Sequence, residues 1–116
     1  MPKKFFKVYD FAEHGNEPQA MNSVRTIDIE GKRICLVRLS DSYYAIDDIC
    51  PHAGARLGLG KCDENGMVVC PIHRYKYDAK TGRGLPQQGD FVNTYVTETR
   101  TDGVYVAFDK KWWQIF

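Results

Sequence analysis

Two short segments of this 116-residue chain bring together side chains that bind metals. The first is Cys50-Pro51-His52 and the second is Cys70-Pro71-Ile72-His73, so the pattern reads C-x-H, then 17 residues, then C-x-x-H. Cysteine thiolates and imidazoles are the protein ligands of zinc, copper and iron–sulfur centres. A chance match at this spacing has a probability on the order of 10⁻⁴. The pattern therefore predicts a metal site.

Two kinds of metal centre fit these four residues. A Cys₂His₂ set binds structural zinc, but zinc sites usually begin with about two to four residues between the first two ligands. Only one residue separates Cys50 from His52. Each segment supplies one cysteine and one histidine, which suits a two-iron cluster with thiolates on one iron and imidazoles on the other. We favour the two-iron cluster and keep a zinc-stabilised binding module as the alternative.

The elements that must position these residues are mostly strands. Residue type and alternation predict strands over 24–29, 32–39, 43–46, 91–100 and 104–108. Glu30-Gly31 and Thr101-Asp102-Gly103 are the expected hairpin turns, and only 10–20 has room for a short helical turn. Most of the glycines fall between these two turns. The expected fold is all-β, an antiparallel β base domain with an inserted Gly/Pro-rich loop region at about 48–90.

Composition indicates a single folded domain over residues 1–116, with no room for a separate catalytic domain. Hydrophobic residues make up 43% of the chain and charged residues 27%, which is ordinary for a globular protein. The 16 basic and 15 acidic residues leave a net charge of +1, so we expect no nucleic-acid partner.

The apolar segments are too short for a membrane partner to be expected. The longest, 34–37 and 67–70, fall far below the roughly 20 residues of a membrane span. Charge within Phe5–Asp10 also breaks the pattern of a signal peptide. Four cysteines in a reducing compartment are expected as free thiols or metal ligands. These features predict a cytoplasmic protein.

The segments Cys50–Leu57 and Cys70–His73, followed by Tyr77-Asp78 and Thr81-Gly82, closely resemble the two cluster-binding loops of Rieske [2Fe-2S] proteins. The resemblance implies a Rieske-like fold and one [2Fe-2S] cluster, a centre with two Cys and two His ligands. It assigns Cys50 and Cys70 to one iron and His52 and His73 to the other. It also implies that further residues lie around the cluster, namely Pro51, Gly54, Leu57, Pro71, Tyr75, Tyr77 and Pro86.

Membrane-bound members of the family carry a disulfide whose positions correspond to Ala55 and Ile72 here, so this chain resembles the soluble, oxygenase-associated ferredoxins. A mononuclear iron site needs two histidines and a carboxylate, and only His14 is left beside the cluster ligands. We therefore expect an electron-transfer protein rather than an enzyme. The expected role is one-electron transfer from a flavin reductase to a terminal oxygenase. The alternative is the small Rieske-like subunit of an assimilatory nitrite reductase.

Two positions near the second segment, Arg74 and Tyr77, carry further expectations. Arg74 stands where the family usually has glycine. High-potential members have a tyrosine at the place of Tyr77 that donates to a ligating sulfur. If 73–77 is extended, His73, Tyr75 and Tyr77 share one face of the strand.

The tail from Lys110 to Phe116, which contains Trp112-Trp113, is expected to pack on the β base.

Overall fold

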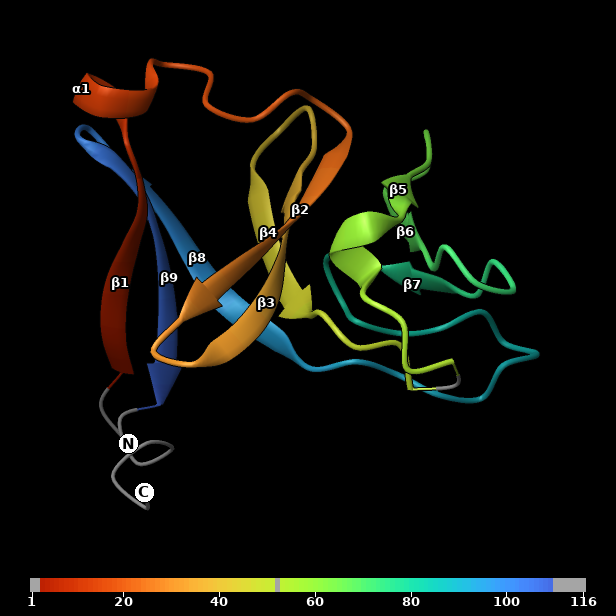
Figure 1. Ribbon diagram of the computed structural model, residues 1–116. Coiled ribbons are helices and arrows are strands. Elements are labelled where there is room, and N and C mark those ends of the chain that lie inside the picture. The colour runs from red at the N-terminus through yellow and green to blue at the C-terminus, as the bar shows by residue number, and fades with distance from the viewer. Residues whose placement is uncertain (1–2, 52, 110–116) are drawn as a thin grey trace.

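Strands form most of the chain in the computed structural model, which describes residues 3–51 and 53–109 (Figure 1). Over these residues, a six-stranded sheet has the order β1-β9-β8-β4-β3-β2, and a three-stranded sheet, β5-β6-β7, lies to one side. Every strand pair is antiparallel, which confirms the expected fold class. The strands are β1 Lys3–Asp10, β2 Ser23–Ile29, β3 Lys32–Arg38, β4 Tyr43–Asp47, β5 Lys61–Cys62, β6 Met67–Val69, β7 Lys76–Asp78, β8 Thr94–Arg100 and β9 Gly103–Asp109.

The hairpin between β2 and β3 forms at the predicted turn. Glu30 and Gly31 both have positive φ, 51° and 84°, as a two-residue turn between twisted antiparallel strands requires. The Asp28 carboxylate accepts a hydrogen bond from the Gly31 amide at 3.0 Å. β3 then pairs with β4, so the chain enters the first metal-binding segment from the middle of the sheet.

The predicted second hairpin differs from the observed one in its turn. Arg100 pairs with Gly103, so the turn is Thr101-Asp102 and the glycine is the first residue of β9. A Cβ at Gly103 would lie 2.0 Å from the carbonyl oxygen of Tyr9 on β1. The glycine is needed for the close approach of these strands, because β1, which the sequence did not predict, pairs with β9.

β3 is buried on both faces, which explains its continuous apolar run. Ile34 and Leu36 belong to one buried cluster, formed with β1, β4 and β9. Cys35 and Val37 point the other way, into a second cluster with residues of the three-stranded sheet and its loops. Each fully buried aliphatic side chain of this kind contributes about 1.5–3 kcal/mol relative to an exposed one. The second cluster joins the large sheet to the region at 48–90.

The region at 48–90 contains more regular structure than the sequence predicted. Besides β5, β6 and β7 it holds a 3₁₀ turn, η1 (Leu57–Leu59). Gly60 follows η1, and a Cβ there would lie 1.9 Å from the carbonyl oxygen of Val69 on β6. The expected short helix within 10–20 is α1 (Phe11–His14), which Figure 1 places at the opposite end of the large sheet from β7.

Candidate metal centre

The first predicted segment forms a tight loop directly after β4. The Cys50 amide donates to the carbonyl oxygen of Ala55, and the Gly54 amide donates to that of Cys50, both at 2.9 Å. Gly54 has a φ of +69°, which suits glycine, and Ile49 bridges to Arg56 across the base of the loop. These bonds fix the position of Cys50 at the end of the strand. His52 lies outside the described residues.

The second segment forms a turn after β6, which corrects the expectation of an extended run from His73. His73 and Arg74 have φ values of +61° and +56°, in the left-handed region. The Cys70 amide donates to the carbonyl oxygen of Tyr75 at 2.7 Å and closes the turn. Both His73 and Arg74 are exposed, and the strand begins only at Lys76. Positive φ at residue 74 gives a physical reason for the glycine that the family usually has there.

The two predicted cysteine ligands are fully buried and lie side by side. Cys50 and Cys70 are 0% exposed, and neither is in a disulfide. Burial raises the pKa of the Cys70 thiol, and the neighbouring Cys50 raises it further, while the Ile72 amide donates to the Cys70 sulfur and opposes the rise. A pair of adjacent sulfurs fits one iron of a two-iron cluster, where each iron takes two protein ligands. The described residues, which omit His52, contain no group of three His, Cys, Asp or Glu around a single point.

Asp48, which the sequence analysis did not single out, holds the first loop against the large sheet. Its side chain is 1% exposed. One carboxylate oxygen, Oδ1, accepts from the Thr26 hydroxyl at 3.0 Å and from the Gly58 amide at 2.8 Å. The backbone oxygen of Asp48 accepts from the Leu57 amide at 2.5 Å. No motif marks this residue, because its partners lie 10 and 22 positions away.

Tyr77 reaches the cysteine pair from β7. The side chain is 0% exposed, and its hydroxyl oxygen lies 3.5 Å from the Cys50 sulfur. The same hydroxyl donates to Oδ2 of Asp90 at 2.9 Å. Burial, followed by the hydrogen bonds to Cys50 and Asp90, raises the pKa of Tyr77 above its usual range. The hydroxyl is therefore part of the site and does not point into water.

The other residues predicted around the cluster divide by exposure. Leu57 is fully buried and packs in the same cluster of side chains as both cysteines. Tyr75 packs against that cluster, and its ring meets the His73 ring edge-on at 6.4 Å between centroids. Pro51, Pro71 and Pro86 are exposed. A shallow depression of about 280 Å³ brings one of these residues, Pro71, beside Cys70; its lining residues are Leu59, Gly60, Lys61, Val69, Cys70, Pro71 and Arg74.

The remaining histidine and cysteines lie elsewhere. The His14 Nδ1 accepts from the Asp10 amide at 3.0 Å, on α1. Cys35 is buried within β3, and burial raises its pKa strongly. Cys62 lies on β5, where burial and then the neighbouring Asp63 raise its pKa. Neither thiol has the lowered pKa of a reactive cysteine.

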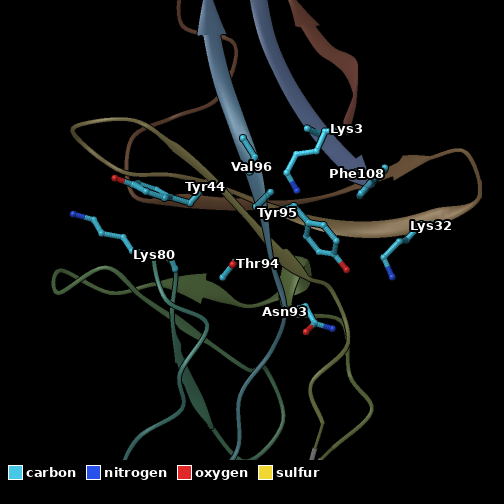
Figure 2. Close-up of a pocket in the computed structure, with 12 residues that line it drawn as sticks. Lys3, Lys32, Tyr44, Lys80, Asn93, Thr94, Tyr95, Val96 and Phe108 are labelled. Carbon is cyan, nitrogen blue, oxygen red and sulfur yellow. The ribbon is translucent and has the colours of Figure 1, made fainter. Parts of the chain in front are cut away.

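A larger cavity, of about 400 Å³, lies on the large sheet (Figure 2). The side chains around it in Figure 2 include Lys3, Lys32, Tyr44, Lys80 and Tyr95. The Tyr95 hydroxyl donates to Asp47 at 2.5 Å, and Lys32 lies 4.0 Å from the same carboxylate. No cysteine or histidine is among the described residues that line this cavity. The contacts of Tyr95 and Lys32 are thus with Asp47, at the end of β4.

The profile of the Rieske [2Fe-2S] domain matches residues 9–96, which include both metal-binding segments and the strands on either side. The chain belongs to the Rieske [2Fe-2S] domain family. Because the centre of this family is a [2Fe-2S] cluster, membership supports the two-iron cluster and sets aside the zinc-stabilised module. Over the described residues, the structure contains no helix long and apolar enough to cross a membrane.

Individual proteins resemble this chain in sequence or in fold. The ferredoxin component of a naphthalene 1,2-dioxygenase system from Pseudomonas aeruginosa is 36% identical over 59 residues, which is 51% of this chain and 56% of the relative. The chain thus spans little more than half the length of that relative.

Two solved structures match over most of the fold. The ferredoxin of carbazole 1,9a-dioxygenase from Nocardioides aromaticivorans IC177 matches with a TM-score of 0.77 and 24% identity over 90% of this chain and 98% of its own. A putative NADH-dependent nitrite reductase small subunit from Mycobacterium tuberculosis matches with a TM-score of 0.78 and 20% identity, over 94% and 98%. At these identities, both comparisons show a similar fold and nothing more.

Proposed function

We propose that this Rieske chain is a one-electron carrier that receives electrons from a flavin reductase and delivers them to a terminal oxygenase. The observation that carries the proposal is the buried pair Cys50 and Cys70 at the base of two loops of a Rieske domain. We assign the cluster ligands to Cys50, His52, Cys70 and His73. When bound, a [2Fe-2S] cluster of this kind supplies a site that takes up and releases one electron.

The residues around the cysteines fit such a cluster. Two adjacent buried thiols are soft ligands once they lose their protons, and binding a metal offsets the cost of burying their charge. The Ile72 amide and the Tyr77 hydroxyl both approach these sulfurs, where donors stabilise negative charge. Leu57 and Tyr77 are buried beside the pair and exclude water from it. In the described part of the site, the two cysteines are therefore buried and His73 lies at the surface.

The surface near His73 supports contact with a redox partner. Leu59 is 68% exposed and Ile72 is 47% exposed. Pro71 is also exposed; it precedes Ile72 in the sequence and lines the same depression as Leu59. Leu57, which the resemblance places around the cluster, is buried and takes no part in this surface. Exposed apolar side chains grouped around a functional site favour protein–protein contact.

The relatives favour an oxygenase as the electron acceptor. The relative from the naphthalene dioxygenase system is named as a ferredoxin component, and it is 36% identical to this chain over the 59 matched residues. The nitrite reductase small subunit matches in fold at lower identity, so we keep that role as the second candidate. We also propose that residues 1–116 form one domain and that the protein is cytoplasmic, a compartment in which disulfides are rare; none of the four cysteines is in a disulfide.

Spectroscopy tests the ligands. The purified protein is expected to be coloured and to give a rhombic EPR signal after reduction. Cys50→Ser and Cys70→Ser should each abolish the assembled cluster, because an alkoxide is a poor substitute for a soft thiolate. His73→Ala should lose the native spectrum, whereas His14→Ala, a matched histidine change on α1, should keep it. A native spectrum and potential in either serine variant would contradict the assignment.

Electron delivery tests the role. A pull-down from native extract, followed by mixing the reduced protein with each captured partner, should identify an oxygenase that reoxidises it. Capture of a large sirohaem-containing subunit as the protein that oxidises it would favour the nitrite reductase role instead. If no captured redox protein oxidises the reduced chain, the carrier function itself is wrong.

A further inference from the structure

We propose that Asp90 is a positioning residue that controls the hydrogen bond between the Tyr77 hydroxyl and the Cys50 sulfur, and thereby adjusts the reduction potential of the site. This inference rests on the proposed ligand role of Cys50. It concerns a residue more than a dozen positions beyond Tyr77 that lies in neither metal-binding segment.

The Tyr77 hydroxyl has one proton and two potential acceptors. Its oxygen lies 2.9 Å from Oδ2 of Asp90, to which it donates, and 3.5 Å from the Cys50 sulfur. A cysteine that ligates a metal is a thiolate and can only accept a hydrogen bond. The Asp90 carboxylate and the Cys50 thiolate therefore compete for the same proton in the loaded protein. The shorter distance favours the carboxylate, so the Cys50 sulfur receives the weaker share of the hydrogen bond.

Asp90 is fixed in place on several sides, so its competition with the sulfur has a defined geometry. The Gly84 amide donates to the backbone oxygen of Asp90 at 3.0 Å. The Gln88 side-chain amide donates to Oδ1 at 3.3 Å. A Cβ at Gly84 would lie 2.6 Å from Oδ1, so the glycine leaves room for the carboxylate. The remaining oxygen, Oδ2, is the one that faces Tyr77.

Gln88 ties this arrangement to the strand that carries Tyr77. Its Oε1 accepts from the Lys76 amide at 3.0 Å, and its Nε2 donates to the Lys76 carbonyl oxygen at 3.2 Å. The side chain of Gln88 thus takes the place of a neighbouring strand along β7. Tyr77 itself bridges to Gly84. The loop from Gly84 to Asp90 and the tyrosine therefore form one hydrogen-bonded unit.

The effect on potential follows from where the proton goes. A hydrogen bond to a ligating sulfur favours the reduced site, because the added electron increases negative charge on sulfur. A carboxylate that draws the hydroxyl proton away weakens this bond, and its own negative charge also opposes reduction. Asp90 lowers the potential on both counts. Its partial exposure to solvent screens the direct charge effect and leaves the hydroxyl as the main route.

A double-mutant cycle separates the two routes. Midpoint potentials are measured by protein-film voltammetry for the wild type, D90N, Y77F and the double variant, all loaded with cluster. Asparagine keeps the shape of Asp90 but is a neutral and weaker acceptor. We expect D90N to raise the potential, and to raise it clearly more when Tyr77 is present than in the Y77F background. E64Q, which removes an exposed negative charge from the β5–β6 turn, is the matched control and should shift the potential little.

The same measurements can overturn the proposal. Equal shifts for D90N in the two backgrounds would mean that Asp90 acts through charge alone, and an unchanged or lower potential would mean that it does not oppose reduction. If D90N does not retain the cluster, D90S is measured against the same expectations. Loss of cluster in both, while Y77F retains it, would make Asp90 an assembly residue instead. A native spectrum in Cys50→Ser would instead refute the ligand assignment, so the two failures are distinguishable.

Discussion

The Tyr77 hydroxyl on β7 lies 3.5 Å from the sulfur of Cys50, a proposed cluster ligand. Tyr77→Phe removes this donor and keeps the buried ring. We expect the cluster to assemble and its reduction potential to fall. A difference of roughly 0.5–1.5 kcal/mol in hydrogen bonding between the two redox states corresponds to about 20–60 mV for a one-electron couple. Protein-film voltammetry at a single pH measures the shift.

A second tyrosine provides the control for this substitution. The Tyr105 hydroxyl donates to Asp102 at 2.8 Å in the turn between β8 and β9. Tyr105→Phe removes one hydroxyl in the same way, with no contact to either cysteine among its described hydrogen bonds. It should leave the potential unchanged. Equal potentials for wild type and Tyr77→Phe would show that the tyrosine serves packing alone.

Arg74 adopts a backbone conformation that disfavours its own side chain. A φ of +56° costs a residue with a Cβ about 1–2 kcal/mol, whereas glycine pays an entropic cost of about 0.5–1 kcal/mol on folding. Arg74→Gly should therefore raise the free energy of unfolding by up to about 1 kcal/mol. Chemical denaturation measures this. Arg56→Gly, at an exposed arginine with a φ of −79°, should instead lower stability, and an equal loss in both variants would contradict the strain argument.

At the scale of elements, the first metal-binding loop and η1 are joined to β2 through one carboxylate. Asp48→Ala leaves the Thr26 hydroxyl and the Gly58 amide without their acceptor. Leaving a buried donor unpaired costs about 1–3 kcal/mol, and these two donors are partly buried. We expect Asp48→Ala to lower the free energy of unfolding by an amount in that range and to reduce the fraction of protein that retains cluster. Denaturation curves and the ratio of cluster absorbance to protein measure the two effects.

A surface carboxylate on another strand separates this effect from a general loss of charge. Glu98 lies exposed on β8 and pairs with Arg100 at 2.6 Å. Exposed pairs of this kind contribute little, typically about 0.2–1 kcal/mol. Glu98→Ala should therefore keep its cluster and most of its stability. A similar loss of cluster in Glu98→Ala would show that the Asp48 contacts are not specific to the loop.

The elements that the sequence predicted are those with a local signal. β2, β3 and β4 have apolar or β-branched runs, and the Glu30-Gly31 turn has the residues that positive φ requires. β1 was missed because its pairing partner, β9, lies at the other end of the chain. β5 and β6 are two and three residues long, too short for a period to appear. Their positions follow from packing against the large sheet.

The residues of the metal site also separate into those that a local sequence pattern predicts and those that it does not. Cysteine and histidine at a characteristic spacing predict metal chemistry from the sequence, and the structure brings Cys50 and Cys70 together. Asp48, Gln88 and Asp90 carry no such pattern, because acidic and amide residues are common in loops. Their roles depend on contacts with Gly58, Lys76 and Tyr77, which exist only after the loops have folded over the strands.

At the scale of the whole molecule, the buried side chains form two clusters, and only one of them contains proposed metal ligands. The cluster that β1, β2, β3, β4 and β9 form contains Leu36, Val104 and Val106 and no predicted ligand. The other contains Cys50, Cys70 and Tyr77 and joins the large sheet to the small one. β3 contributes to both. Metal binding should therefore stabilise the two halves of the molecule unequally.

Hydrogen exchange of the loaded and cluster-free protein tests this expectation. Without the cluster, two buried thiols lie side by side, and the loops around them lose the free energy that metal binding contributes. Amides of the metal-binding loops and of β5, β6 and β7 should exchange much faster, because local opening there no longer breaks metal–ligand bonds. Amides that pair β1 with β9 and β8 with β9 should keep most of their protection, since their apolar contacts are unchanged. An equal loss of protection over both sheets would mean that the chain unfolds as one cooperative unit and that the cluster stabilises all of it.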